Sequence, residues 1–131
     1  ARRSAREIAR SVGAAVGTVI SHIRKLEAEG VIRGYSAIID YSKLGYDLTV
    51  VTEITVAKGK LTEIEKSIAK LPEACAVYDV TGTTDAIVIA KFRSREELSS
   101  FTKSLLKMPY VERTNTHVVL STAKEDFRIP I

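Results

Sequence analysis

The spacing of apolar residues predicts a helix over residues 14–30. In this segment apolar side chains recur three and four positions apart, which is the spacing of one face of an amphipathic helix. They are Val16, Val19, Ile20, Ile23 and Leu26. Gly30 follows and is typical of a helix end, because a residue without Cβ adopts the left-handed conformation at little cost.

A shorter helix is predicted directly before it, over residues 4–12. Ser4 and Glu7 have the spacing of a capping box, in which a hydroxyl and a carboxylate each bind a backbone N–H group at the start of a helix. Ile8 and Val12 mark its inward face. The glycine and alanine that follow leave room only for a tight turn. A short helix, a glycine turn and a longer helix form the pattern of a helix-turn-helix, whose second helix enters the major groove of DNA.

From residue 46 onward, apolar residues recur at every second position in some segments, as in strands. In other segments they recur at every third or fourth position, as in helices. This spacing predicts a strand at 46–56, a helix at 61–71, strands at 76–81 and 86–92, a helix at 95–108 and a strand at 112–120. This βαββαβ order is that of the ferredoxin-like fold, a four-stranded antiparallel sheet with two helices on one face. The predicted fold class is therefore α+β.

The pattern also divides the chain. We predict a helix-turn-helix domain at 1–30, a linker at 31–45, a ferredoxin-like domain at 46–120 and a tail at 121–131. Residues 31–40 alternate loosely and predict a strand, whereas residues 40–45 have the composition of a turn. In the tail, Phe127, Ile129 and Ile131 alternate with two other residues, and this alternation predicts a short edge strand. One of the two other residues is a proline, which an edge strand tolerates.

The strand at 86–90 is apolar on both faces, although the two helices can cover only one face of the sheet. Val51 on the first strand repeats this feature. We therefore expect a second copy of the chain to pack sheet to sheet on the other face, as a homodimer.

The positive charge of the chain lies entirely in the helix pair. The formal net charge is +4, and residues 1–35 carry seven basic and three acidic side chains, whereas the rest of the chain has equal numbers of each. This asymmetry favours contact with a polyanion such as DNA. The polar face of the second helix offers Thr18, Ser21, His22 and Lys25, whose side chains can reach base edges and phosphates. A helical hairpin in a protein core, with a solvated charged face, is the alternative.

Composition excludes several other classes. No apolar run approaches the length of a membrane span, and we find no signal peptide. The single cysteine, Cys75, excludes an internal disulfide, fits a reducing cytoplasm and is expected to be a small core residue. His22 and His117 lie in different predicted domains, and the sequence contains no phosphate-binding glycine loop or metal-spaced cluster. We therefore expect no cofactor, no metal and no catalysis.

Four segments resemble the Lrp/AsnC family, the feast/famine transcription regulators. Residues 23–32 look like the end of the family's recognition helix, and residues 34–37 look like the segment that follows it. The Gly82-x-x-Asp85 turn looks like its effector loop. The run 109–116, with Pro-x-Val and Thr-x-Thr, resembles its entry into the last strand.

The resemblance implies an amino-acid-responsive DNA-binding regulator that forms dimers and assembles into octamers of four dimers. The family's first helix is expected to be absent, because the sequence starts after the point where that helix ends. The residues expected to bind DNA are Arg3, Arg6, Thr18, Ser21, His22, Arg24 and Lys25. The residues expected to bind an effector between dimers are Gly82, Thr83, Asp85, Thr116 and His117.

Two other functions stay open at this point. The chain could be an amino-acid-sensing or assembly module that binds no DNA. It could also be a small enzyme, because dimeric ferredoxin-like barrels include monooxygenases, although a shared fold says little about activity.

Overall fold

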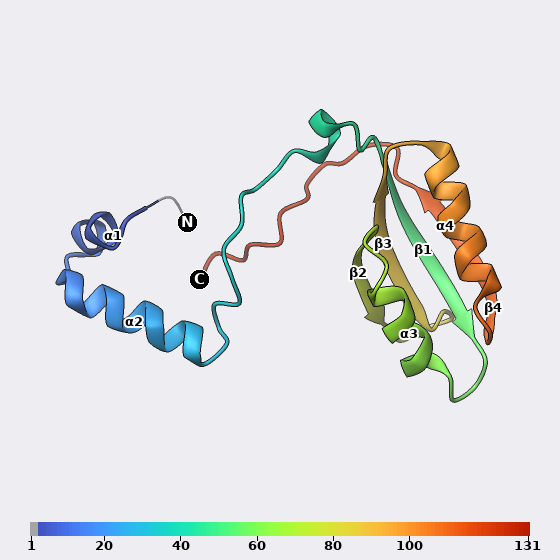
Figure 1. Ribbon diagram of the computed structural model, residues 1–131, viewed down its shortest axis with the longest axis horizontal. Coiled ribbons are helices and arrows are strands. Elements are labelled where there is room, and N and C mark those ends of the chain that lie inside the picture. Colours follow the sequence, from blue (N-terminus) through green and yellow to red (C-terminus); the bar gives the residue numbers. More distant parts are fainter. Residues whose placement is uncertain (1–2) are drawn as a thin grey trace. The chain divides into compact units, whose positions relative to one another are not determined.

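The computed structural model describes residues 3–131, and the chain divides into two compact units, 1–39 and 40–131. The first unit contains the helices α1 (Ala5–Val12) and α2 (Val16–Ala28), joined by the sharp turn seen in Figure 1. Ser4 caps α1, because its hydroxyl oxygen accepts a hydrogen bond from the Glu7 N–H group at 3.2 Å. The predicted helix pair is confirmed.

Small side chains pack α1 against α2. Ala9 and Val19 are the buried residues of the two helices, with 3% and 6% of their surface exposed. The predicted inward position of Val12 is wrong, since this residue is 67% exposed. It is the last residue of α1, and no element of the described first unit covers it.

The end of α2 is set by a glycine. The Gly30 N–H group donates to the Glu27 carbonyl at 3.1 Å, and the Val31 N–H group donates to the Leu26 carbonyl at 2.9 Å. These two bonds define the Schellman motif, which requires a positive φ at the residue after the helix. Gly30 supplies it with a φ of 76°.

The predicted strand at 31–40 does not form. These residues have no regular structure, and Ile38 is 78% exposed. A strand needs a neighbour to bind its backbone N–H and C=O groups, and within the described chain no segment pairs with this one. The turn predicted at 40–45 contains a short 3-10 helix, η1 (Tyr41–Leu44), capped by Asp40.

The second unit has the predicted ferredoxin-like topology. Its strands are β1 (Leu48–Val56), β2 (Ala74–Asp79), β3 (Ala86–Phe92) and β4 (Val111–Val118), and its helices are α3 (Leu61–Ala69) and α4 (Arg95–Lys107). The sheet order is β2-β3-β1-β4, and every pair of neighbours is antiparallel. Strand β2 begins two residues earlier than predicted, and β4 ends two residues earlier.

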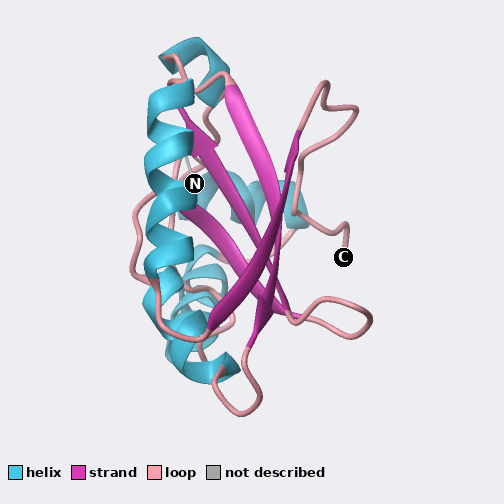
Figure 2. Cartoon of the chain, turned by 90° about the vertical axis from the view of Figure 1, so that its right-hand side faces the viewer, coloured by secondary structure: helices cyan, strands magenta, loops and turns pink. Residues whose placement is uncertain are grey.

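Helices α3 and α4 cover the same face of the sheet (Figures 1 and 2). Alternate residues of β1 and β3 point toward these helices and are buried, as the period of two in the sequence predicts. The core contains Val50, Ile54, Ile64, Ile68, Val88, Phe92, Phe101 and Leu105. Thr52 is also buried on this side, where its hydroxyl lies 3.3 Å from that of Thr116 on β4.

The opposite face of the sheet, here called the open face, carries no helix in the described unit. It combines an apolar centre with polar residues on β4 and toward both ends of β1. By register its members are Thr49, Val51, Glu53, Thr55, Ala76, Tyr78, Ile87, Ile89, Lys91, Arg113, Asn115 and His117. Tyr78 is 45% exposed, and Val51, Ile87 and Ile89 are half-buried.

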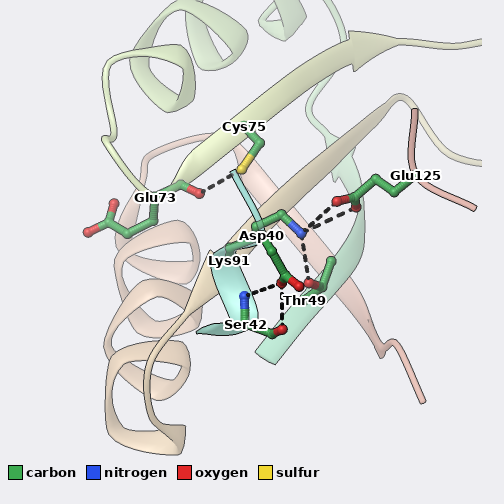
Figure 3. A network of polar contacts seen from close by, with 7 residues as sticks. All are labelled: Asp40, Ser42, Thr49, Glu73, Cys75, Lys91 and Glu125. Carbon is green, nitrogen blue, oxygen red and sulfur yellow. Dashed lines mark hydrogen bonds and ion pairs between the residues drawn. The ribbon is translucent and has the colours of Figure 1, made fainter. Parts of the chain in front are cut away.

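Residues 119–131 follow β4 without forming the predicted edge strand. An ion pair attaches this tail to the sheet, because the Lys91 Nζ atom lies 3.0 Å from a Glu125 carboxylate oxygen and donates to the Thr49 hydroxyl at 3.1 Å (Figure 3). The side chains of Phe127 and Ile129 are exposed. Within the described chain no strand pairs with the tail. The alternation of its apolar residues is therefore not enough to form a strand.

Cys75 is exposed, which contradicts the core position expected from the sequence. The pairing of β2 with β3 shifts between Ala74 and Ala76, and this irregularity removes Cys75 from the inward–outward alternation. The thiol instead donates a long hydrogen bond to the Glu73 carbonyl at 3.8 Å (Figure 3).

Candidate DNA-binding and effector-binding sites

The polar side of α2 is open to solvent. Thr18, Ser21, His22, Arg24 and Lys25 are all exposed, so each of the predicted DNA-contacting residues of this helix is available to a ligand. Val19 anchors the opposite side of α2 against α1. The helix therefore presents hydroxyl, imidazole and cationic groups outward.

The basic residues outside α2 add to this surface. Arg3, directly before α1, and Arg6 and Arg10 on that helix are exposed. Arg2, which contributes to the predicted charge, lies outside the described residues. One acidic residue of α2 is engaged, because the Tyr35 hydroxyl donates to Glu27 at 3.3 Å. Desolvation of the hydroxyl, followed by the charge of Glu27, raises the pKa of Tyr35.

Helix α2 starts without a side-chain cap. Ala15 occupies the N-cap position with the extended backbone, φ −70° and ψ 146°, that serine or threonine adopts there. Its methyl group cannot accept a hydrogen bond from the first turn. The first turn of α2 also contains no acidic residue. Its N–H groups and the positive end of the helix dipole are thus left for an anion such as a DNA phosphate.

The loop of residues 80–85 is bonded to the end of β1. Strand β3 begins only at Ala86, so the last residues of β1 have no strand beside them on that edge. The Asp85 carboxylate accepts the Val56 N–H group at 2.8 Å, and the Thr84 hydroxyl donates to the Ile54 carbonyl at 3.0 Å. These two hydrogen bonds take the place of those that a neighbouring strand would make with β1.

Asp85 therefore has a structural task in addition to the predicted binding of an effector ammonium group. Its carboxylate oxygen Oδ2 is engaged with β1, whereas Gly82 and Thr83 at the tip of the loop are exposed. Gly82 adopts a φ of 111°, which L side chains rarely adopt, and this explains glycine at this position.

Thr116 and His117 lie on opposite faces of the sheet. Thr116 pairs with Thr52, whose side chain is buried under the helices, while His117 pairs with Val51 on the open face. Successive residues of a strand point to opposite faces, so the side chains of Thr116 and His117 leave β4 in opposite directions. The assignment of Thr116 and His117 to an effector site stays a prediction.

A polar cluster surrounds Glu53 on the open face. The Glu53 oxygen Oε2 accepts hydrogen bonds from Asn115 Nδ2 at 2.9 Å and from His117 Nε2 at 3.1 Å. A carboxylate can only accept such bonds, so the imidazole donates from Nε2. The bond from His117, followed by that from Asn115, lowers the pKa of Glu53.

A hollow of about 380 Å³ lies beside this cluster, where β1, β4 and the 80–85 loop meet. It is lined by Glu53, Thr55, Thr83, Thr84, Arg113, Thr114 and Asn115. Thr83 is the one predicted effector residue among them. Glu53 and Arg113 were not predicted from the sequence, because the register of β1 and β4 is what brings these two residues near each other. The alternation of polar side chains along β1 and β4 was the one sequence signal that indicated these two residues.

Within residues 3–131, no group of three or more histidine, cysteine, aspartate or glutamate side chains could hold a metal ion. No helix in that range is both long and apolar enough to cross a membrane.

Comparison with known proteins places this geometry in a family. A model of the Lrp/AsnC ligand-binding domain matches residues 49–129, and a model of winged helix-turn-helix DNA-binding domains matches residues 1–33. The chain belongs to the Lrp/AsnC family. This member is a DNA-binding transcription regulator whose second unit is a ligand-binding domain.

Curated relatives of this Lrp/AsnC protein are regulators of the same type. An uncharacterized HTH-type transcriptional regulator of Pyrococcus furiosus is 52% identical over 128 residues, which are 98% of this chain and 86% of that protein. The HTH-type transcriptional regulator FL11 of Pyrococcus horikoshii is 40% identical over 126 residues, which are 96% of this chain and 83% of FL11.

Solved structures share the fold. The feast or famine regulatory protein of Mycobacterium tuberculosis, complexed with L-methionine, has a TM-score of 0.84 and 26% identity, over 98% of this chain and 87% of that one. A transcriptional regulator of Neisseria meningitidis, also in complex with L-methionine, has a TM-score of 0.89 and 23% identity, over 98% of this chain and 86% of that one. At 23% identity, the second likeness shows the fold alone.

Replacing Asp85 by alanine is expected to destabilise the second unit. The half-buried Val56 N–H group would lose its acceptor, at a cost of about 1–3 kcal/mol. Asp85→Asn keeps an acceptor oxygen and should cost less. Urea unfolding of both variants measures the difference. Equal stability of Asp85→Ala and the wild type would contradict the structural role of this carboxylate.

Replacing Ala15 by serine is expected to stabilise α2. The backbone already has the N-cap conformation, so the new hydroxyl can accept an N–H group of the first turn, a gain of about 0.5–1 kcal/mol. Amide hydrogen exchange in α2 should slow accordingly. Ala14→Ser, one residue earlier, is the matched control and should leave this exchange unchanged.

Proposed function

We propose that the polar side of α2 is the DNA-contacting surface of this regulator. The observation that carries the proposal is the coincidence of two features in one small unit. The unit bears the whole net positive charge of the sequence, and the outward side chains of α2 are free of packing contacts with α1. In this proposal Thr18, Ser21 and His22 face the bases. Arg3, Arg6, Arg24 and Lys25 bind phosphates, which position the helix but carry no sequence information.

We further propose that the regulator acts as a homodimer that packs through the open face. Val51, Ile87 and Ile89 give the centre of that face a hydrophobic surface that water would otherwise cover. Two such sheets stack at a separation of about 10 Å, which excludes water between them. A dimer would present two copies of α2 to successive major grooves, about 34 Å apart.

The proposed effector is a free amino acid. Two relatives with the same fold are complexed with L-methionine, and the second unit of this chain matches the ligand-binding domain of the family. Binding near the exposed tip of the 80–85 loop, with four dimers assembling into an octamer, would couple the effector to DNA binding. The regulator would act in the cytoplasm, where DNA is accessible, and would have no enzymatic activity of its own.

The double variant His22→Ala with Lys25→Ala is expected to weaken DNA binding. Removing one phosphate-binding cation should reduce the slope of the logarithm of affinity against the logarithm of salt concentration by about 1. Gel-shift titrations against the upstream region of the gene measure both quantities. Lys66→Ala on α3 is the matched control, since it removes an exposed lysine from the other unit. Unchanged binding of the double variant would refute the assigned surface.

The variant Ile89→Glu is expected to convert the dimer to monomers. A carboxylate at the centre of the open face would be buried without a partner in the dimer but solvated in the monomer. Sedimentation velocity measures the mass. Leu106→Glu serves as the control, because this leucine is 52% exposed on α4, on the other side of the sheet. If Ile89→Glu stays dimeric, the dimer uses another surface.

A further inference from the structure

Three polar side chains converge on one point of the open face. Glu53 on β1 lies directly opposite Asn115 on β4, and His117 follows two residues later on the same face of β4. The Glu53 Oε2 atom lies 2.9 Å from Asn115 Nδ2 and 3.1 Å from His117 Nε2, and the two nitrogen atoms lie 3.4 Å apart. The three atoms therefore form a nearly equilateral triangle.

Hydrogen bonds cannot satisfy all three edges of this triangle. A carboxylate oxygen only accepts, and the amide nitrogen of asparagine only donates. The ring nitrogen Nε2 of His117 has one position in the plane of the ring, which carries either a proton or a lone pair. With a proton it donates to Glu53 but faces the Asn115 amide as a second donor. With a lone pair it accepts from Asn115 but faces Glu53 as a second acceptor. One edge is therefore unfavourable in every protonation state of the ring.

A metal ion bound by the three groups removes this conflict, because each group can offer it a lone pair. Glu53 offers a carboxylate oxygen, His117 offers Nε2, and Asn115 offers Oδ1 once its amide group turns over and exchanges oxygen and nitrogen. Metal–ligand bonds of about 2.0–2.1 Å separate neighbouring ligand atoms by about 2.9 Å in an octahedral site and about 3.3 Å in a tetrahedral site. The edges of 2.9, 3.1 and 3.4 Å are close to these separations.

The neighbouring residues and the ligand types define which ion fits. Ile87 of β3 lies opposite Glu53 on the other side of β1 and adds no charge. Arg113 lies diagonally across from Glu53, and its positive charge opposes a bound cation. One imidazole, one carboxylate and one amide oxygen suit a first-row divalent ion such as Zn²⁺, whereas Ca²⁺ prefers oxygen ligands alone.

We propose that Glu53, Asn115 and His117 bind a divalent transition-metal ion, represented by Zn²⁺, on the open face of the second unit. The site does not depend on the proposed amino-acid effector and gives the regulator a second chemical input. An ion can reach it, since the side chains of His117 and Glu53 are 57% and 34% exposed. Three protein ligands leave a coordination position free for water.

No metal is predicted from the sequence, and the fold explains why. Glu53 and Asn115 are 62 residues apart, and only the antiparallel register of β1 and β4 places them opposite each other. The third ligand is an amide, which does not belong to the histidine, cysteine, aspartate and glutamate side chains that identify most metal clusters. Among the described residues no three of those four types come together.

Calorimetric titration of the metal-free full chain with zinc chloride at neutral pH tests this assignment. Glu53→Gln, Asn115→Leu and His117→Ala should each weaken Zn²⁺ binding at least about tenfold, because even the loss of a residue that only supports a metal ligand costs about 10–100-fold. The matched control is His22→Ala, which removes the other histidine of the chain. It should bind Zn²⁺ like the wild type.

Two further variants should bind Zn²⁺ more tightly than the wild type, a result that a loss of structure cannot produce. Asn115→Asp keeps an oxygen ligand and adds a negative charge beside the ion. Arg113→Gln removes the cation that opposes it. Nitrogen-15 NMR of the wild type then identifies the ligand directly: the Nε2 resonance of His117 should shift on addition of Zn²⁺, while that of His22 should stay in place.

Three outcomes overturn the proposal. The first is a wild type that does not bind Zn²⁺. The second is His117→Ala binding Zn²⁺ as tightly as the wild type, because the ion would then lie elsewhere on the chain. The third is weaker binding by Asn115→Asp, since the side chain at this position would then point away from the ion. None of these results bears on the proposed amino-acid effector.

Discussion

The structure of the second unit depends on one constraint: a sheet has two faces, and the chain provides helices for only one. Helices α3 and α4 bury Val50, Ile54, Val88 and the other inward residues of the sheet. The outward residues Ile87 and Ile89 have the same apolar character but no cover in the described chain. The hydrophobic effect acts on both faces equally, and this is the physical basis of the proposed association of the open face with a second copy.

The same open face is apolar at its centre and polar at the end near the 80–85 loop. These two regions favour different kinds of contact. At the apolar centre, contact with another sheet is favourable. Toward the 80–85 loop, Glu53 and Arg113 replace the apolar residues, and the strand β3 has ended. The loop closes the gap with hydrogen bonds from Asp85 and Thr84 to β1. A ligand in this region would lie beside the proposed dimer contact, which provides a physical route from effector to assembly.

Local pattern was sufficient to predict the helices and strands. The periods of two and 3.6 identified the four strands and the two α-helices of the second unit, because burial against one layer of helices imposes those periods directly. The predictions that were wrong are those that depend on the pairing of strands. Residues 31–40 have the composition of a strand but no partner, and Cys75 leaves the alternation at an irregularity in β2. The separation of Thr116 from the other site residues follows from register, which a single sequence does not reveal.

The most direct test of the account is a search for contacts between two copies of the open face in solution. Mixing isotope-labelled and unlabelled chains allows nuclear Overhauser effects between copies to be separated from those within one chain. The account predicts such effects between the methyl groups of Ile87, Ile89 and Val51 and the ring of Tyr78. Intermolecular effects confined to residues of α3 and α4, or a monomer that shows none, would contradict it.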